Sequence, residues 1–385
     1  MSELKPGWRR VKFGEVVRLV REMCRNPVAE GIDRYIGLEH LEPGDLRVRS
    51  WGDVSDGTTF TNRARPGQVL FGKRRAYQRK VAVANFDAVC SGDIYILESA
   101  DPGKLIPEIL SFICQTDAFY NHAVGTSAGS LSPRTNWESL AAYEFALPSL
   151  EQQRRIAVLL QRSRDLVDCY RDLDEACIKV RCALGKKFFI TGPEGKRRTV
   201  GDVAKVQNGT TPRRNVAEYW GGTVPWLPTG KVNERRITGA DEFVTEKALA
   251  ECSLEVLPVG TVLVAMIGEG ITRGKVARLE LPACINQNFA AVIPGQEIDG
   301  WFLFYYLESQ YEALRRWSQG TNQQALNSSL VRSFPVHVPA LDRQREIAAI
   351  LREVDEQGNQ ALSRLSSADA QFRLTSAMTL SGAPS

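Results

Sequence analysis

Apolar residues recur at alternating steps of three and four along two long stretches of the chain. The first stretch holds Ile156, Leu159, Ser163, Leu166, Tyr170, Leu173, Cys177, Val180 and Leu184. The second holds Ile347, Leu351, Val354, Gly358, Ala361, Leu365, Ala368 and Phe372. This spacing is typical of a helix that packs against a partner helix. It predicts one helix over 149–188, roughly 60 Å long at 1.5 Å per residue, and a second helix over 339–380.

The two predicted helices begin with related sequences. Residues 147–160 and 338–351 align without a gap at an offset of 191 residues. Half of the aligned positions are identical, namely Pro148/Pro339, Leu150/Leu341, Gln153/Gln344, Arg154/Arg345, Ile156/Ile347, Ala157/Ala348 and Leu160/Leu351. Self-similarity at a fixed offset indicates an internal duplication. We therefore expect the two helices to pack antiparallel on each other as spacers. The alternative is that each helix only covers its own domain.

The segments before the two helices also share features. Phe-Gly-Glu-Val at 13–16 matches Val-Gly-Asp-Val at 200–203, and Lys80-Val-Ala matches Lys275-Val-Ala. A helix expected over 106–120 matches another over 300–317. The pattern predicts an α/β (α+β) fold in which two similar domains are each followed by a long helix that joins an antiparallel coiled coil. The expected boundaries are 1–147 for the first domain, 148–190 for its helix, 191–338 for the second domain and 339–380 for its helix.

Composition and charge narrow the class of protein. The chain has 43% hydrophobic residues but no run of 18 apolar residues, and its start lacks the apolar segment of a signal peptide. Its eight cysteines include no Cys-x-x-Cys pair, and its three histidines are scattered. We expect a cytoplasmic protein with reduced cysteines and no metal site. The net charge of +4 is small, so any polyanion-binding surface has to be local.

A basic run at residues 73–80 is the first candidate for nucleic-acid contact. It places Tyr77 and Gln78 between five cations, Lys73, Arg74, Arg75, Arg79 and Lys80. Arginine can hold phosphates or read guanine, and glutamine can read adenine. The plain alternative is a solvated basic turn. The matching place in the second half keeps Arg273 and Lys275.

Polar loops supply the remaining candidates. The loop at 125–131 matches that at 320–326, which suggests Ser127, Ser130 and Arg134 in one domain and Asn322, Gln323 and Gln324 in the other. A third segment, 208–231, combines hydroxyl groups, arginines and aromatic residues, and its candidates are Thr210, Thr211, Arg213, Arg214 and Lys231. Its aromatic residues are expected to lie in the core.

Two near-matches to catalytic motifs fail on their chemistry. Gly125-Thr-Ser-Ala-Gly129 fits the hydrolase pattern Gly-x-Ser-x-Gly, but Asn322 stands at the equivalent position and only His337 follows in the chain. Gly268 to Lys275 approaches a phosphate-binding loop, but its spacing is one residue too long and Val276 replaces the Ser or Thr that would hold magnesium. We expect no catalytic residues in this chain.

The sequence of residues 208–226 resembles that of a known protein family. Asn208-Gly-Thr-Thr-Pro followed by Glu218-Tyr-Trp-Gly-Gly-Thr-Val-Pro-Trp resembles the start of a target recognition domain in the specificity subunits of Type I restriction–modification systems. Residues 70–84 and 89–94 are similar to another version of that domain. The Leu-Pro-x-Leu-x-x-Gln-x-x-Ile repeats resemble the starts of the family's two spacer helices, so the resemblance covers nearly the whole chain.

The resemblance implies a non-catalytic subunit of a phage-defence complex that binds double-stranded DNA. Each domain would read one half of a bipartite asymmetric site, and the helices would bind two methyltransferase subunits, with room for restriction subunits. S-adenosylmethionine, ATP and Mg²⁺ would be bound by those partners and not by this chain. We place the subunit interface at Gln153, Ile156, Leu160, Gln344, Ile347 and Leu351.

Two other functions stay open at this point. A coiled-coil adaptor with no DNA role would not show salt-dependent binding to duplex DNA. A stand-alone modifying enzyme would methylate DNA without a partner.

Overall fold

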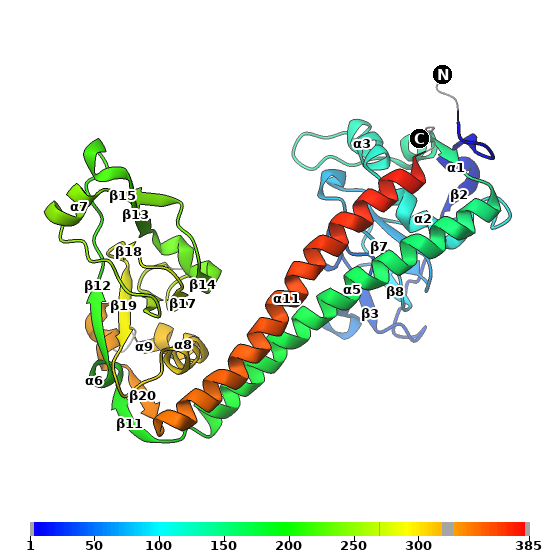
Figure 1. The fold of residues 1–385 in the computed structure, drawn as a ribbon. Coiled ribbons are helices and arrows are strands. Elements are labelled where there is room, and N and C mark those ends of the chain that lie inside the picture. The colour runs from blue at the N-terminus through cyan, green and yellow to red at the C-terminus, as the bar shows by residue number, and fades with distance from the viewer. Residues whose placement is uncertain (1–3, 269, 318–325, 382–385) are drawn as a thin grey trace. The chain divides into compact units, whose positions relative to one another are not determined.

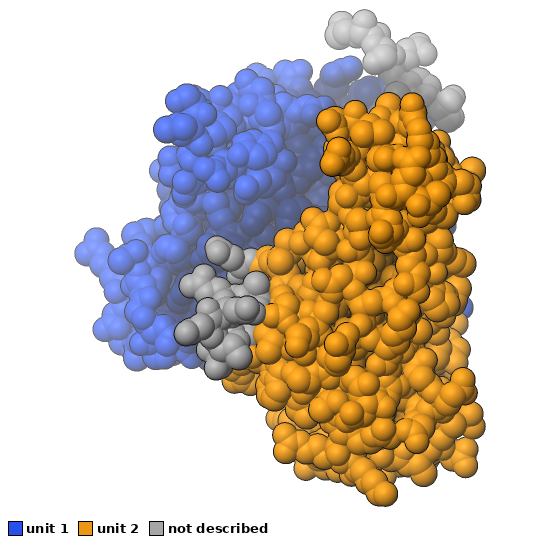
Figure 2. Space-filling view, turned by 90° about the vertical axis from the view of Figure 1, so that its left-hand side faces the viewer, with its two compact units in different colours: residues 1–170, 363–385 blue, residues 171–362 orange. Residues whose placement is uncertain are grey.

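The computed structural model describes residues 4–268, 270–317 and 326–381, which form two compact units (Figure 2). The first unit contains residues 1–170 and 363–385, and the second contains residues 171–362. Each unit therefore combines one globular segment with parts of both long helices, α5 (Leu150–Lys186) and α11 (Leu341–Leu380).

The first unit is built on a four-stranded sheet in the order β2-β9-β6-β7. A second sheet, in the order β4-β3-β8-β5, contains a parallel pair, β3 and β8. A separate antiparallel pair, β1 and β10, joins the two ends of the globular segment. The strands are β1 (Arg9–Lys12), β2 (Val17–Leu19), β3 (Arg34–Ile36), β4 (Gly52–Asp53), β5 (Asn62–Ala64), β6 (Val69–Gly72), β7 (Val81–Val83), β8 (Ala88–Cys90), β9 (Ile94–Ser99) and β10 (Glu144–Leu147).

The second unit repeats this plan. Its main sheet has the order β12-β19-β16-β17-β14, its smaller sheet the order β15-β13-β18, and β11 pairs with β20. As in the first unit, the smaller sheet contains one parallel pair, β13 and β18. The strands are β11 (Lys196–Thr199), β12 (Ala204–Asn208), β13 (Trp220–Leu227), β14 (Arg236–Ile237), β15 (Glu242–Val244), β16 (Val262–Ala265), β17 (Val276–Leu279), β18 (Cys284–Ile285), β19 (Phe289–Pro294) and β20 (Pro335–Val338). The shared sheet orders support the duplication inferred from sequence.

Each predicted helix of the globular segments is divided into two. The stretch expected at 106–120 forms α2 and α3, because Thr116 caps α3 by accepting a hydrogen bond from the Phe119 N–H. The stretch expected at 300–317 likewise forms α8 and α9. The short helices are α1 (Phe13–Val16), α2 (Pro107–Cys114), α3 (Asp117–Gly125), α4 (Trp137–Ala141), α6 (Val200–Val203), α7 (Glu246–Glu251), α8 (Gly300–Ser309), α9 (Tyr311–Trp317) and α10 (Ser328–Ser333).

The antiparallel pairing of the long helices is present within each unit (Figure 1). In the first unit, Arg164 lies over the Phe372 ring and Tyr170 lies under Arg364, so residue numbers rise on α5 as they fall on α11. In the second unit, Arg181 pairs with Asp355 at 2.8 Å, and a Cβ at Gly358 would meet the Cβ of Cys177 at 3.3 Å. The small residue at 358 lets the two helices approach closely, as its sequence suggested.

The buried face of α5 differs from the predicted one. Leu159, Leu166, Leu173 and Val180 are exposed, and the buried residues include Gln153, Ala157, Leu160, Arg164 and Val167. The predicted seam followed the leucines, but buried polar side chains occupy part of the true seam because they bond to groups in the globular segment. On α11 the predicted seam is largely correct, with Ile347, Leu351, Ala361, Ala368 and Phe372 buried.

Candidate nucleic-acid interface

A loop between β8 and β9 lies at the centre of the candidate site in the first unit. Its last residue, Asp93, accepts a hydrogen bond from Arg134 Nε at 2.8 Å and one from Arg74 Nη1 at 3.3 Å. Burial by itself raises the pKa of a carboxyl, yet Arg134 and Arg74 together hold the pKa of Asp93 below its ordinary value. Asp93 is therefore a charged anchor that orients two of the predicted DNA-contacting arginines.

Ser132 links the loop that follows α3 to the basic run. Its Oγ accepts hydrogen bonds from Arg74 Nη2 at 3.1 Å and from Arg75 Nη2 at 3.3 Å. The backbones also meet, because the Arg75 N–H donates to the Pro133 carbonyl at 2.7 Å. The structure thus brings together two segments that the sequence proposed separately.

The basic run bends sharply at two arginines. Arg75 and Arg79 have φ values of 53° and 55°, and they flank the short 3₁₀ helix η3 (Ala76–Gln78). A left-handed backbone is uncommon for residues other than glycine. The turn leaves the Tyr77 side chain exposed and Gln78 half-buried, with the Gln78 N–H bonded to the Arg75 carbonyl at 2.8 Å. It therefore presents an aromatic ring between two cations.

Several cations of the run have partners within the first unit. Lys73 Nζ lies 4.7 Å from the centre of the Tyr95 ring, and Lys80 Nζ donates to the Leu38 carbonyl at 2.7 Å. Arg75 differs, because in the described part of the chain its guanidinium bonds to a hydroxyl and to no carboxylate. Its positive charge is the least compensated among the three arginines of the run.

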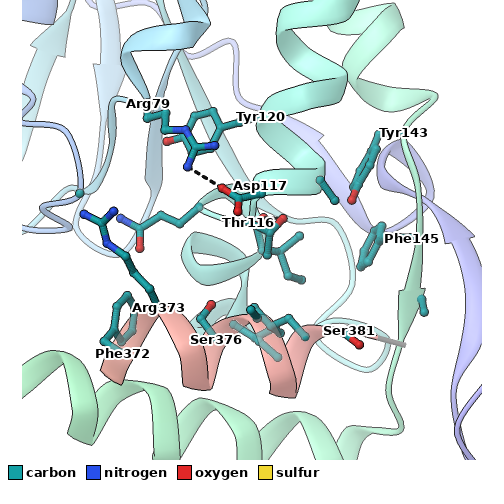
Figure 3. Close-up of a pocket in the computed structure, with 18 of the residues that line it drawn as sticks. Arg79, Thr116, Asp117, Tyr120, Tyr143, Phe145, Phe372, Arg373, Ser376 and Ser381 are labelled. Carbon is teal, nitrogen blue, oxygen red and sulfur yellow. Dashed lines mark hydrogen bonds and ion pairs between the residues drawn. The ribbon is translucent and has the colours of Figure 1, made fainter. Parts of the chain in front are cut away.

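Arg79 lines a cavity of about 560 Å³ in the first unit (Figure 3). It pairs with Asp117 at 2.6 Å and lies over the Tyr120 ring, and the C-terminal turns of α11 form another wall with Phe372 and Ser376. Arg79 is thus bound to α3, whereas Arg74 and Arg75 bond to Ser132. The predicted run of five cations is divided between two environments.

The loop after α3 is polar and partly exposed. Ser127 Oγ donates to the Ala123 carbonyl at 2.7 Å at the end of α3, and Ser130 is exposed. Leu131, which the sequence analysis did not single out, is 89% exposed beside Ser132.

The equivalent loop in the second unit connects β18 to β19 and also lies under candidate residues. The Thr210 N–H donates to the Ile285 carbonyl at 2.9 Å, and Thr211 Oγ1 bonds to the Gln287 side chain. A Cβ at Gly209 would lie 2.1 Å from the Ile285 carbonyl oxygen, so glycine is required for this approach. Residues 208–211 are therefore fixed against the loop.

The two arginines of the 208–214 segment have different surroundings. Arg213 is exposed, while Arg214 pairs with Glu242 and lies 4.0 Å from the centre of the Trp220 ring. Trp226 is fully buried and donates its Nε1–H to the Thr210 carbonyl at 3.0 Å. The prediction that these tryptophans belong to the core is correct for Trp226 and correct in part for the half-buried Trp220.

The remaining candidate residues of the second unit lie outside the 208–214 segment. Lys231 pairs with Glu234 at 2.6 Å and with Asp241 at 2.9 Å, and these two carboxylates raise its pKa. Lys275 Nζ donates to Asn233 Oδ1 at 2.7 Å and lines a cavity of about 320 Å³. Arg273 is half-buried. The candidates Asn322, Gln323 and Gln324 lie outside the described residues.

The residues predicted to form a subunit interface have intrachain roles. Gln153 Nε2 donates to the carbonyls of Lys104 and Pro148 at 2.9 Å each, and its Oε1 accepts from the Ile106 N–H at 2.9 Å. Side chains buried in the same way are Leu160, Gln344, Ile347 and Leu351, and Ile156 is half-buried.

Sequence reasoning missed Asp93, Ser132 and Gln287. Asp93 lies in the 89–94 text that was compared with known recognition domains, but it was not recognised as an anchor. Its loop and that of Gln287 occupy the same place in the duplication, between equivalent strands of the two units. Aligning the two halves through this loop would have indicated both residues.

No group of three or more His, Cys, Asp or Glu side chains suited to a metal ion occurs in the described ranges. None of the helices within those ranges has the length and apolar character needed to cross a membrane.

A comparison with known protein families finds a match in the second half of the chain. Residues 194–365 match the family described as Type I restriction modification DNA specificity domain. Specificity subunits of Type I restriction–modification systems are also similar to this chain outside that range. One of them, the MjaVIII specificity subunit of Methanocaldococcus jannaschii, is 24% identical over 383 residues, covering 90% of this chain and 86% of that protein.

Other relatives match over shorter stretches. The MjaIX specificity subunit of Methanocaldococcus jannaschii is 30% identical over 164 residues, covering 41% of this chain and 37% of that protein. The EcoR124I/EcoR124II specificity subunit of Escherichia coli is 26% identical over 164 residues, covering 41% and 40%. The chain thus spans about two fifths of the length of each of these two relatives.

Solved structures agree on the fold. The S subunit of a Type I system from M. genitalium has a TM-score of 0.67 at 15% identity, with 97% of this chain and 96% of that chain covered. A chain from a study of complex assembly in the Type I R-M system has a TM-score of 0.56 at 20% identity, with 98% of each chain covered. At these identities the likeness concerns architecture, and it extends over both halves.

Proposed function

We propose that this chain is the non-catalytic, sequence-specific DNA-binding subunit of a Type I restriction–modification complex in the cytoplasm. Each globular segment, with the boundaries expected above, acts as a target recognition domain for one half of a bipartite asymmetric site. The long helices bind two methyltransferase subunits. Those partners supply S-adenosylmethionine and adenine methylation, and restriction subunits, where they join, supply ATP- and Mg²⁺-dependent cleavage.

One observation carries the proposal for DNA reading. Both units place the same loop, 91–93 in the first and 286–288 in the second, beneath candidate side chains, but the polar groups on this shared frame differ. In the first unit Asp93 orients Arg74 and Arg134, and in the second Gln287 bonds to Thr211. Two domains that recognise different half-sites need different hydrogen-bond donors and acceptors, and here both units present them on the same backbone frame.

The charges near Asp93 fit a phosphate-contacting role. Arg74 and Arg134 share one carboxylate, and Arg75 adds a guanidinium that bonds only to a hydroxyl among the described residues. The cluster therefore keeps a net positive charge beside the exposed Tyr77 ring. Guanidinium groups fixed in this way can exchange an internal partner for a phosphate oxygen or a base edge.

Exposed apolar side chains on the long helices support the proposed partner sites. Leu159 on α5 and Ile350 on α11 occupy equivalent positions in the duplication, and both are exposed although each lies beside a buried residue. Exposed apolar side chains at repeated positions suit contacts with a second protein. One such position in each unit supports two equivalent methyltransferase contacts.

DNA binding is tested with the complete chain co-purified with its methyltransferase subunit. Affinity for a duplex that carries the methylated site is compared with affinity for a scrambled duplex at several salt concentrations. We expect a linear fall of log affinity with log salt, with a slope of about −0.9 per neutralised phosphate, and tighter binding to the cognate duplex. Salt-independent or absent binding would favour the adaptor function, and methylation by the chain alone would favour a stand-alone enzyme.

A further inference from the structure

The two long helices bury corresponding positions, with one reversal of charge. At the offset of 191 residues, Gln153, Ala157 and Leu160 on α5 correspond to Gln344, Ala348 and Leu351 on α11, and all are buried. The next buried position holds Arg164 on α5 and Asp355 on α11. These repeated positions thus carry opposite charges at one buried place, and α5 in addition buries Asp168 where α11 exposes Asn359.

In the first unit the buried cation bonds to the globular segment. Arg164 is 1% exposed, and its Nη1 donates to the Gly44 carbonyl at 2.6 Å. Its Nη2 donates to Asp45 Oδ1 and to Asp168 Oδ1, both at 3.0 Å. Asp45 also accepts from Arg49 Nε at 2.7 Å, and Asp168 from Arg47 Nε at 2.9 Å. The helix supplies the central cation and the globular segment supplies a carboxylate.

In the second unit the signs of the charges on the helix and on the globular segment are reversed. Asp355 accepts from both terminal nitrogens of Arg235, each at 3.2 Å, from Arg181 at 2.8 Å and from the Tyr305 hydroxyl at 2.7 Å. Arg235 also bonds bidentately to Glu308, with Nη2 to Oε2 at 2.9 Å. Here the helix supplies the central carboxylate and the globular segment supplies the cation.

The two domain-side partners come from equivalent places in the fold. The Leu46 carbonyl accepts from the Val83 N–H on β7 at 2.8 Å, and the Arg235 carbonyl accepts from the Arg278 N–H on β17 at 2.7 Å. Because β7 and β17 are equivalent strands, Leu46 corresponds to Arg235. Asp45 therefore lies one residue from the position that holds Arg235 in the other unit.

We propose that two buried ion pairs of opposite polarity, Arg164 with Asp45 and Asp355 with Arg235, match each globular domain to its own helix. We call these four residues the docking key. A domain placed against the wrong helix would bring Asp45 towards Asp355, or Arg235 towards Arg164, in a buried site where like charges cannot be solvated. The shared Gln, Ala and Leu positions cannot discriminate between the domains, since they are identical or similar. The four key residues are positioning residues, and the proposal does not depend on what the domains bind.

The test is a charge-reversal cycle in the full-length chain, measured by thermal unfolding. The variants are Arg164→Asp, Asp45→Arg and the combination of both, which exchanges the signs of the two buried charges in the first unit. Each single reversal should lower Tm by about 6 °C or more, and the double variant should recover at least half of the summed loss. Arg162→Asp, an exposed position on the same helix, is the matched control and should shift Tm by less than about 2 °C.

A second variant separates charge sign from packing. Arg164→Met removes the charge but keeps an unbranched side chain, so it should lower Tm less than Arg164→Asp does. If Arg164→Asp yields no soluble protein while the double variant does, the key is supported in the same way. Equal losses for Arg164→Met and Arg164→Asp, or a double variant no more stable than the weaker single variant, would overturn the proposal.

Discussion

Gln153 and Gln344 make the same three hydrogen bonds in the two units. The Nε2 group of Gln344 donates to the carbonyls of Glu297 and Pro339 at 3.0 and 2.9 Å, and its Oε1 accepts from the Asp299 N–H at 2.8 Å. Gln153 bonds in the same pattern to Lys104, Pro148 and Ile106. A buried amide thus fastens each globular segment to the start of the helix that follows it.

Replacing either glutamine should destabilise its unit. In Gln153→Ala the Ile106 N–H and two carbonyls lose their buried partner, and each unsatisfied buried group costs about 1–3 kcal/mol. We expect a loss of at least about 2 kcal/mol in the free energy of unfolding, measured by urea denaturation, and a similar loss for Gln344→Ala. Gln161→Ala is the control, because this exposed residue bonds only to Asp165 among the described residues. Equal behaviour of Gln153→Ala and Gln161→Ala would show that the fastening is energetically unimportant.

Adjacent leucines on α5 should separate folding from assembly. Leu160 is fully buried, so Leu160→Asp should destabilise the chain by several kcal/mol, at least about 3. Leu159 is exposed, so Leu159→Asp should leave urea unfolding nearly unchanged but reduce co-purification of the methyltransferase subunit. Ile350→Asp should act like Leu159→Asp in the other unit. Wild-type assembly with both exposed variants would remove these positions from the partner surface.

Asp93 should control the balance between specific and non-specific DNA binding. In Asp93→Ala the guanidinium groups of Arg74 and Arg134 lose their shared carboxylate, so local positive charge rises while the orientation of both side chains is lost. We expect tighter binding to a scrambled duplex and a smaller ratio of cognate to scrambled affinity. The comparison variant is Asp101→Ala, a half-buried carboxylate paired with Lys104 at 3.7 Å. If Asp93→Ala kept the parental ratio of cognate to scrambled affinity, Asp93 would not contribute to sequence recognition.

The stability contributed by Asp355 should depend on pH. Burial by itself raises its pKa, but Arg235, Arg181 and Tyr305 hold the pKa of Asp355 below its ordinary value of 3.8. A carboxyl with a depressed folded-state pKa stabilises the fold above its ordinary pKa, and this contribution is lost as the pH falls through the folded-state pKa. The difference in unfolding free energy between the parent and Asp355→Asn should be full at pH 6 and shrink below pH 3.8. A pH-independent difference would assign the effect to geometry alone.

The sequence predicted the duplicated architecture because repeated text and apolar spacing are local signals. It did not predict which face of α5 is buried, since that face includes Arg164 and Asp168, whose burial depends on Asp45 and other residues more than a hundred positions away. The predicted seam instead followed the leucines at 159, 166 and 173, which are exposed, so Leu173→Asp would not bury a charge. With Leu173 exposed, that substitution should cost the fold little.

The candidate site was predicted unevenly for a related reason. Residue type and charge indicated Arg74, Arg75 and Arg134, and the structure places them in one cluster. Their organising partners, Asp93 and Ser132, carry no distinctive local pattern, because they matter only through contacts that the fold creates. The separation of Arg79 from this cluster likewise follows from its pairing with Asp117 on α3.

The central claim is tested most directly by mapping methylated adenines across a genome that expresses the chain with its methyltransferase subunit. The parent should direct methylation to one bipartite asymmetric sequence. A chain whose residues 199–338 are exchanged for the equivalent domain of a relative, with an arginine retained at the place of Arg235, should change one half of that sequence and leave the other half intact. Methylation that did not depend on the chain, or a change in both halves after the exchange, would contradict the account.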